Sequence, residues 1–460
     1  MERLSSLDTV FLAIEDPTSH MNLGSVAIFE GPAPPFETVC DFLAAKIPLV
    51  PRCRQRVREP SGVLGRPVWI DDVGFDLHDH VHSLWLPEQG PGFLEDVTAE
   101  LLAAPLERRR ALWEVWVVDG LGDDCWAIIA KVHHCMVDGI AGSDLLSAIL
   151  DREPDAEAAA PDSWAPSPEP SALAFARFSV ATTLRSVIVH LHHAADVLRH
   201  AGRHWERFRG IITASKRLWY RQRHGPTSLT GPIGAHRRWV HTAVRFEDIT
   251  AVRDAFGGTV NDVIVAAVSM GLRDLLIARG ESVSGRTVTA LVPVSLRGPA
   301  EDHQVGNRIA NVHALLPIGQ TNPRSTLQAV HDHLDDLKNS HEVEATGLLL
   351  GIGDYVPRAL ADRIARTILR RQSNVETVIT NVPGPRSPLY LEGHKMIRAY
   401  PVAPIGGQVR IAIAIWSYCD TLSIGVTGDR DTAQDISHLE RGITCGFAEL
   451  VDAARTALPH

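Results

Sequence analysis

The apolar residues of this chain follow two different spacings along its length. Short, mainly apolar runs, such as 126–132 and 287–294, predict buried strands, because a strand covered on both faces carries mostly apolar side chains. Segments with apolar residues every three or four positions predict amphipathic helices. We expect helices at 35–47, 93–104, 140–150, 260–277, 323–341, 357–371 and 435–458. We expect further strands at 21–29, 69–70, 81–86, 238–245 and 376–380.

Two pairs of neighbouring apolar runs predict hairpins. Runs 113–118 and 126–132 flank the Gly- and Asp-rich turn 120–124, and run 409–416 is followed shortly by 421–427. Strands and helices mix throughout the chain, and no repeat of solenoid length is visible. The pattern therefore predicts an α/β fold with mixed sheets.

A proline-rich acidic segment at 151–171 interrupts this pattern. It holds five prolines and six acidic residues against one basic residue, Arg152, which is the composition of a solvated linker. A chain of 460 residues is also too long for one ordinary core. We therefore predict an N-terminal domain over 1–150, a linker followed by basic amphipathic helices over 151–230, and a C-terminal domain over 231–460.

The segment 172–224 is strongly basic within an acidic protein. It contains ten Lys and Arg residues and two acidic residues, whereas the whole chain has a formal net charge of -10. Two interpretations of its helical apolar spacing stay open. The helices pack on the protein's own core, or they dock on anionic lipid head groups, where each basic residue adds about 1 kcal/mol.

Composition narrows the class of protein further. The acidic net charge argues against a general nucleic-acid binder. No apolar run approaches the roughly 20 residues that span a bilayer, and residues 1–5 lack the apolar core of a signal peptide. The six cysteines lie far apart without a CxxC pair, as expected in a reducing cytosol. We predict a cytoplasmic protein that contacts lipid, if at all, as a peripheral protein at the lipid surface.

The candidate chemistry lies at the end of the predicted strand 126–132. Two adjacent histidines, His133 and His134, follow that run, and Asp138 and Gly139 complete the pattern HHxxxDG. An imidazole has an unperturbed pKa of about 6.5, so near neutral pH it is mostly unprotonated and suited to act as a general base. The pattern therefore indicates proton abstraction at a rigid strand end.

Two other chemistries remain open on the residues alone. His134 and Asp138 have the helical i, i+4 spacing of metal ligands, but the sequence contains no HExxH motif and no cysteine partner at this place. Cys135 is a candidate nucleophile only if its pKa is lowered and substrate can reach it. We predict no metal at this site.

The pattern HHxxxDG resembles the active-site motif of the bacterial wax ester synthase/acyl-CoA:diacylglycerol acyltransferase family, which is part of the chloramphenicol-acetyltransferase-like superfamily. Further segments carry the resemblance over nearly the whole chain: Leu4-Ser5-Ser6-Leu7-Asp8, Thr259-Val260-Asn261-Asp262, Pro293-Val294-Ser295-Leu296-Arg297 and Thr380-Asn381-Val382-Pro383-Gly384-Pro385. The resemblance implies two chloramphenicol-acetyltransferase-like domains with a central tunnel between them.

The resemblance also implies roles for the motif residues. His134 would be the general base and His133 its support. Asp138 would be structural and pair with Arg297, while Gly139 would allow close backbone approach. One departure is visible: many members carry Pro-Leu-Trp before the second strand, and this chain has Ala111-Leu112-Trp113.

Polar residues of two downstream segments have open roles. Asn261 and Asp262 either cap the helix 260–277, with Thr259 as its N-cap residue, or Asn261 projects toward the reacting carbonyl. Thr380 and Asn381 end a strand, where their hydroxyl and amide groups can donate to an oxyanion or to the thioester.

We therefore expect an acyltransferase that moves a long-chain acyl group from acyl-CoA, as co-substrate, to diacylglycerol or to a long-chain alcohol. We expect direct transfer without an acyl-enzyme, no bound cofactor and no nucleic-acid partner. Residues 172–224 would place the protein on the inner membrane face or on lipid droplets. The alternatives are an enzyme that uses a carrier-protein-bound acyl group and a non-catalytic lipid-binding scaffold.

Overall fold

The computed structural model describes most of the chain. The described residues are 1–60, 65–86, 92–122, 124–139, 148–156, 164–182, 227–295, 309–338 and 375–457, with 185, 363 and 367 as isolated positions. The helices expected at 140–150 and 357–371 lie almost wholly outside this set. The same holds for the basic segment 172–224 beyond residue 182 and for Arg297.

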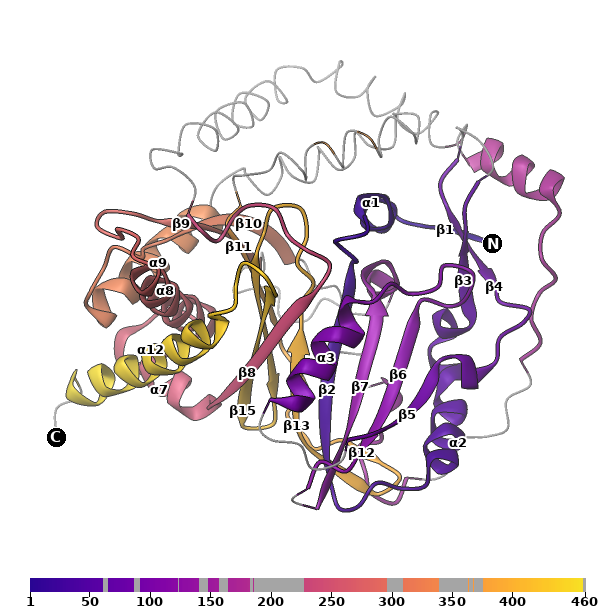
Figure 1. Ribbon diagram of the computed structural model, residues 1–460, viewed down its shortest axis with the longest axis horizontal. Coiled ribbons are helices and arrows are strands. Elements are labelled where there is room, and N and C mark those ends of the chain that lie inside the picture. The colour runs from indigo at the N-terminus through magenta and orange to yellow at the C-terminus, as the bar shows by residue number, and fades with distance from the viewer. Residues whose placement is uncertain are drawn as a thin grey trace.

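The described residues form a first six-stranded sheet, built mainly from the N-terminal half, in the order β12-β13-β2-β7-β6-β5 (Figure 1). The strands are β2 (Asn22–Glu30), β5 (Val81–Trp85), β6 (Trp113–Asp119), β7 (Cys125–His133), β12 (Tyr390–Leu391) and β13 (His394–Val402). Only β5 and β6 run parallel, and the other neighbours are antiparallel. The predicted pairing of β6 with β7 is confirmed.

A second six-stranded sheet in the C-terminal half has the order β10-β9-β11-β14-β15-β8. Its strands are β8 (Arg237–Arg245), β9 (Val288–Ser295), β10 (Ile309–Leu316), β11 (Thr377–Val382), β14 (Ile411–Tyr418) and β15 (Thr421–Asp429). Strand β11 runs parallel to both β9 and β14, whereas β14 and β15 form the predicted antiparallel hairpin. The expected fold class, an α/β fold with mixed sheets, is therefore confirmed.

Among the described residues, four helices pack on the C-terminal sheet, at the left in Figure 1: α7 (Phe246–Phe256), α8 (Val260–Ala278), α9 (Pro323–Lys338) and α12 (Ile436–Ala457). Helices α8 and α12 cross at glycines. A Cβ atom on Gly271 would lie 2.7 Å from the backbone nitrogen of Ile443, and one on Gly442 would lie 2.9 Å from Gly271 Cα. These glycines allow the close helix approach, so a larger side chain at either position would force the helices apart.

The two sheets meet where the C-terminal half contributes to the N-terminal sheet. Strands β12 and β13 come from residues within the predicted C-terminal domain 231–460, yet β13 pairs with β2. Next to this crossover β13 contacts β15, where a Cβ atom on Gly425 would lie 1.9 Å from the carbonyl oxygen of Pro401. The halves are thus joined through backbone as well as side chains.

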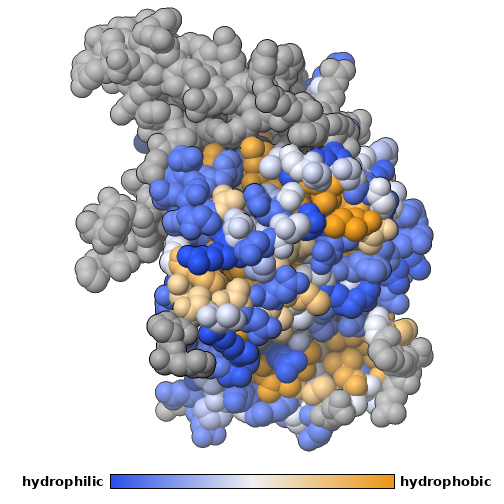
Figure 2. Space-filling model, turned by 90° about the vertical axis from the view of Figure 1, so that its left-hand side faces the viewer, coloured by the Kyte–Doolittle hydropathy of each residue, from blue (hydrophilic) through white to orange (hydrophobic). Residues whose placement is uncertain are grey.

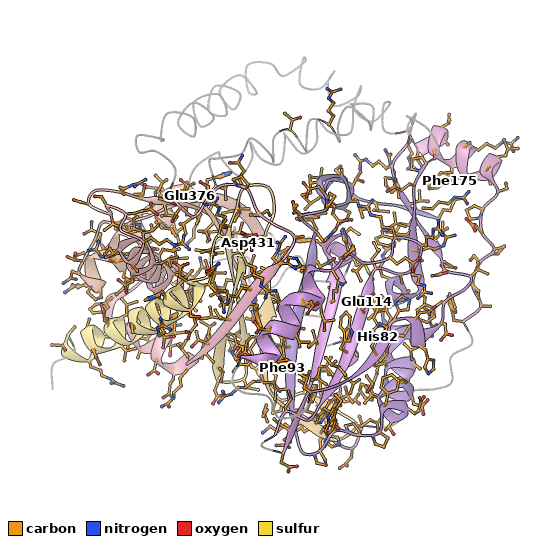
Figure 3. The ribbon with its side chains drawn as sticks, in the orientation of Figure 1. His82, Phe93, Glu114, Phe175, Glu376 and Asp431 are labelled. Atoms are coloured by element: carbon orange, nitrogen blue, oxygen red, sulfur yellow. The ribbon has the colours of Figure 1, made fainter. Side chains whose placement is uncertain are left out.

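Smaller elements surround the N-terminal sheet. They are α1 (Ser6–Ile14), α2 (Phe36–Lys46), α3 (Phe93–Ala103) and a three-stranded sheet of β1 (Glu2–Arg3), β4 (Val68–Asp71) and β3 (Gln55–Arg58). A helix over 172–182 packs on the small sheet through Phe175, which is buried against Val68 and Ile70 (Figure 3). The sequence predicted α2 and α3 but not α1, α7 or β13.

The outer face of the C-terminal half is largely hydrophilic, with separate hydrophobic patches, as Figure 2 shows. This fits helices whose apolar stripes face the sheet beneath them. No helix among the described residues is both long and apolar enough to cross a bilayer.

Candidate active site

Strand β7 carries the two candidate histidines to its end. The two histidines lie in different surroundings: His134 lines a cavity together with Ala130, Lys131 and Val132, while His133 is buried, with 2% of its surface exposed. The apolar run thus ends with one imidazole in the cavity wall and one in the protein interior.

The N-terminal helix and the segment after it hold His134 in place. The backbone N–H of His134 donates to the carbonyl oxygen of Met21 at 2.8 Å. Its ring stacks on Phe11 of α1, with centroids 3.8 Å apart and planes 24° apart. Helix α1 is itself fixed at its start, where Ser5 Oγ accepts from Asp8 N at 3.0 Å. The position of the ring therefore depends on a helix far from β7 in sequence.

The surroundings of His134 keep its ring neutral. Burial, reinforced by the nearby His133, lowers the pKa of His134 to about 4, although a backbone hydrogen bond acts in the opposite direction. A ring with this pKa is unprotonated at neutral pH and has a free nitrogen lone pair. His134 can thus accept a proton from a bound hydroxyl group.

His133 is held from both ring nitrogens. Its Nδ1 accepts from the backbone N–H of Cys135 at 3.1 Å, so the ring proton is assigned to Nε2. Nε2 lies 3.1 Å from Glu15 Oε1. This arrangement places a buried imidazole between a backbone donor and a carboxylate at the turn in which His134 begins. The supporting role expected of His133 in catalysis stays a prediction.

Glu15 is the central acceptor of this arrangement. Its carboxylate also accepts from Met21 N at 2.9 Å and from Arg108 Nη2 at 2.8 Å. Burial alone would raise the pKa of Glu15. The contact with His133, with the hydrogen bonds from Arg108 and Met21, outweighs this effect of burial and lowers the pKa of Glu15 to about 2. Glu15 is therefore ionised across the physiological range.

The cavity beside His134 has a volume of about 370 Å³ and is lined mainly by apolar side chains. That volume falls in the range of small-molecule and cofactor sites. The N-terminal half contributes residues of β2, β6 and β7, and the C-terminal half contributes β11, β14 and the end of β13. Examples from the two halves are Leu23, Ala27, Leu43, Val50, Ile128, Ala130, Thr380, Val382, Ala414 and Trp416. The cavity thus extends between the two halves, as a tunnel requires.

A partly buried ion pair adds the charged groups of this lining. Lys131 Nζ lies 3.2 Å from Glu114 Oε2, and the Lys131 side chain is 1% exposed. Glu114 is labelled in the N-terminal sheet in Figure 3. Burial lowers the pKa of Lys131, against the opposing effect of Glu114. Neither residue stands out in the sequence, because a charge inside a strand becomes notable only once its burial is known.

The downstream polar residues reach different places. Thr380 lines the cavity, but Asn381, the next residue on β11, is not among its lining residues. Asn381 Nδ2 instead donates to Asn261 Oδ1 at 3.1 Å and so links β11 to the first turn of α8. Asn261 does not line the cavity either. A contact of these two amides with substrate stays a prediction.

Asp262 takes part in capping α8. Its side chain accepts from Thr259 N at 2.8 Å, while Thr259 Oγ1 accepts from Asp262 N at 3.2 Å. This is a capping box, so the predicted N-cap residue Thr259 is confirmed. Asp262 Oδ2 also lies 2.9 Å from His331 Nδ1 of α9. The carboxylate is wholly buried, and it fastens the start of α8 to α9.

Other predicted site residues lie outside the described side chains. For Asp138 and Gly139 only the backbone is described, as the end of the 3-10 helix η4 (His134–Gly139), and Arg297 is not described. Their pairing stays a prediction. Cys135 is 2% exposed, and burial raises the pKa of its thiol, which disfavours the thiolate that a cysteine nucleophile needs.

Comparison with protein families agrees with this geometry. The model of the wax ester synthase/diacylglycerol acyltransferase catalytic domain matches residues 4–264, and the model of the C-terminal domain of that family matches residues 305–451. A putative diacylglycerol O-acyltransferase of Mycobacterium bovis is 35% identical over 459 residues, covering 98% of this chain and 96% of the relative. A probable diacylglycerol O-acyltransferase of Mycobacterium tuberculosis strain H37Rv matches with the same identity and coverage.

Solved structures share the fold at lower identity. The wax ester synthase/diacylglycerol acyltransferase from Marinobacter aquaeolei VT8 is 24% identical with a TM-score of 0.70, covering 98% of this chain and all of that one. The trichothecene 15-O-acetyltransferase from Fusarium sporotrichioides is 12% identical with a TM-score of 0.64, covering 97% of this chain and 94% of that one. These structures support the two-domain architecture that the sequence predicted.

Proposed function

The chain belongs to the wax ester synthase/diacylglycerol acyltransferase family, and on that premise we propose that it transfers a long-chain acyl group from acyl-CoA to diacylglycerol. One observation carries the proposal most directly: the neutral ring of His134 stands in the wall of an apolar cavity of about 370 Å³. A base at such a position meets a hydroxyl group where competing water is largely excluded.

The proposed reaction is a direct transfer within a ternary complex. His134 accepts the proton of the acceptor hydroxyl as its oxygen attacks the thioester carbonyl. The C–S bond then breaks, and the departing CoA thiolate takes up the proton from His134, so that the products are the ester and CoA. Thr380 lines the same cavity and can donate its hydroxyl hydrogen to the oxyanion.

The lining supports a fatty acyl donor. Ala27, Leu43, Val50, Ile128 and Met136 offer hydrocarbon surface. Burial of each methylene group contributes about 0.8 kcal/mol, so a long chain gains considerably more binding energy here than an acetyl group. Alanines at 27, 130 and 414 keep this part of the cavity open. Enlarging Ala130 would narrow the cavity on the face of β7 that also leads to His134.

A lipid surface is the proposed source of the acceptor. In the helix 172–182, Leu173 is 62% exposed and Val180 is 48% exposed, and Arg177 is exposed between them. An exposed apolar face at the start of a strongly basic segment suits an anionic membrane or a lipid droplet. Flotation with anionic vesicles should recover the protein, and Leu173→Ser with Val180→Ser should reduce that recovery. Equal recovery of both proteins would contradict docking through this helix.

The experiment for the reaction is a substrate panel with purified protein. Labelled hexadecanoyl-CoA is offered with dioleoylglycerol, with hexadecanol or without acceptor, and a parallel series offers the acyl group on a carrier protein. We expect triacylglycerol from the CoA donor, and wax ester to the extent that the alcohol is accepted. Turnover only from the carrier protein would move the enzyme to that donor class. Saturable lipid binding without any turnover would instead indicate a scaffold.

A cavity variant separates binding of the acyl chain from chemistry. Ala130→Leu should lower activity with long-chain acyl-CoA by about 10-fold or more while sparing short-chain donors, because overfilling a packed site costs about 1–3 kcal/mol. Cys445→Ala, at an exposed position on α12, is the matched control and should leave both activities unchanged. An equal loss with long and short donors would contradict an acyl chain in this cavity.

A further inference from the structure

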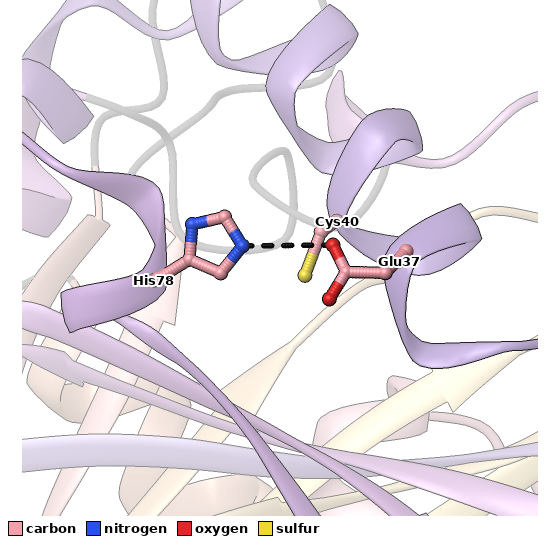
Figure 4. Close-up of side chains that lie close together, drawn as sticks. All are labelled: Glu37, Cys40 and His78. Atoms are coloured by element: carbon pink, nitrogen blue, oxygen red, sulfur yellow. Dashed lines mark ion pairs between the residues drawn. The ribbon is translucent and has the colours of Figure 1, made fainter.

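Three metal-binding side chains converge outside the cavity. Glu37 and Cys40 come from α2, and His78 comes from the 3-10 helix η3 (Leu77–Asp79), as Figure 4 shows. One ligand atom from each, a carboxylate oxygen, the Sγ atom and a ring nitrogen, lies within 4.8 Å of the other two. His78 is far from Glu37 and Cys40 in sequence, so their spacing gives no metal motif. Only the fold brings them together.

Local structure aims all three side chains at one point. Glu37 and Cys40 are three residues apart on α2 and therefore share a helix face. The backbone N–H of His78 donates to Asp76 Oδ1 at 3.0 Å, which fixes the start of η3. The ring Nδ1 of His78 lies 3.3 Å from the same oxygen, and its Nε2 lies 3.6 Å from Glu37 Oε2. Nε2 is thus presented to α2.

The Asp76–His78 contact has the geometry of a metal-ligating histidine. Such histidines usually donate their second ring N–H to a carboxylate, which sets the tautomer and leaves the other nitrogen with a lone pair for the metal. Here Asp76 would receive Nδ1–H, and Nε2 would face the Glu37 and Cys40 ligand atoms. The Sγ atom of Cys40 adds a third possible ligand atom within 4.8 Å, which an ordinary surface pair of a histidine with acidic residues lacks.

We propose that Glu37, Cys40 and His78 form a zinc site with one position open to water. The donor set of sulfur, nitrogen and oxygen suits Zn²⁺, which commonly takes three protein ligands and a water molecule. Two zinc ligands at about 2.0–2.1 Å in tetrahedral geometry lie about 3.3 Å apart. The present 3.6 Å between His78 Nε2 and Glu37 Oε2 is close to that separation.

Exposure decides which ligands must move to bind the ion. The Glu37 and His78 side chains are 74% and 60% exposed, so both can shift toward a metal without disturbing the core. Cys40 is 3% exposed and belongs to the core beneath α2. The sulfur would thus be the fixed ligand, and the other two would close over the ion from the solvent side.

A bound ion would connect the site to the cavity through α2. Leu43, one turn after Cys40 on that helix, lines the cavity. An ion held by α2 and η3 would therefore restrain the helix that forms part of the cavity wall. Its proposed effect is this restraint of α2, and the ion takes no part in the transfer at His134.

The test uses Co²⁺ as a spectroscopic probe on the purified full-length chain, followed by displacement with Zn²⁺. The wild type should take up one equivalent with visible bands of four-coordinate cobalt and a thiolate-to-cobalt charge-transfer band, and Zn²⁺ should abolish these bands. His78→Ala should lose the four-coordinate spectrum, and Asp76→Asn should weaken affinity by about 10- to 100-fold. Both positions are exposed, so these variants should remain folded.

Cysteine variants identify the sulfur ligand. Cys40→Ala should abolish the charge-transfer band, whereas Cys445→Ala, which removes an exposed thiol elsewhere, should retain it. Zn²⁺ should also raise the unfolding temperature of the wild type but not that of His78→Ala. Absence of a charge-transfer band in the wild type would overturn the proposal. So would a band that survives in Cys40→Ala or disappears in Cys445→Ala.

Discussion

Replacing Glu15 by glutamine tests how firmly the N-terminal segment holds the histidine turn. Glutamine keeps the size of the side chain but removes its charge. The carboxylate is 3.1 Å from His133 Nε2 and accepts hydrogen bonds from Met21 N and Arg108 Nη2. An amide cannot accept at both ends, so its NH₂ group must face one of these donors. The substitution thus leaves a buried donor without its partner.

The pKa of Glu15 gives the expected magnitude. It is lowered from its ordinary value of 4.5 to about 2, and at about 1.4 kcal/mol per pH unit this corresponds to about 3 kcal/mol of folding free energy. Because the folded-state pKa is lowered, this stability is fully present above pH 4.5 and is lost as the pH falls toward 2. Glu15→Gln should therefore cost about 3 kcal/mol at pH 7 and flatten the acid dependence of stability.

Urea unfolding of the wild type and Glu15→Gln at pH 7 and pH 4 measures both effects. Glu59→Gln is the matched control, since Glu59 binds the same Arg108 at 3.1 Å but is 45% exposed and not in contact with His133. An exposed pair of this kind contributes at most about 1 kcal/mol. Equal stability losses in the two variants, or an unchanged pH dependence in Glu15→Gln, would refute the account of the buried carboxylate.

Three further predictions concern the site and the fold. Because the pKa of His134 is lowered to about 4, kcat/KM measured over a pH series should fall on the acid side near pH 4. An acid-side decrease centred at pH 6.5 would contradict the buried neutral ring. Phe11→Ala removes the ring stacked on His134 and should lower kcat/KM by about 10-fold, because an aromatic pair contributes about 0.5–1.5 kcal/mol. Unchanged kinetics would argue against positioning of His134 by α1. Gly425→Ala puts a Cβ atom 1.9 Å from Pro401 O and should lower the free energy of unfolding in urea by about 2 kcal/mol or more. An unchanged urea midpoint would show that the contact between β13 and β15 can relax.

Strand β7 and its histidines could be predicted because the signals agree. A mainly apolar run, a Gly- and Asp-rich turn before it and a second run across the turn all indicate a buried hairpin strand. Helix α8 was predictable for the same reason, with Thr259 as its cap and most of the following positions apolar. In both elements, the local sequence pattern and the packing of the folded protein favour the same secondary structure.

The parts that could not be predicted depend on distant partners. Strand β13 contains Pro401 and becomes a strand through pairing with β2, from the other end of the chain. Helix α1 is short, and its purpose appears only in the stacking of Phe11 on His134. The hydrogen bond between the side chains of Asn381 and Asn261 joins residues 120 positions apart, so no local spacing in the sequence indicates it. Contacts of this kind require the fold.

Substitution of His134 by alanine is the most direct test of the central claim. With hexadecanoyl-CoA and dioleoylglycerol, ester formation by His134→Ala should fall about 100- to 10,000-fold, which is the contribution expected of a positioned general base. The variant should remain folded, with a urea unfolding midpoint close to that of the wild type. Cys135→Ala, at the adjacent buried residue, should retain most of its activity. Undiminished ester formation by His134→Ala would contradict the assignment of this imidazole as the base.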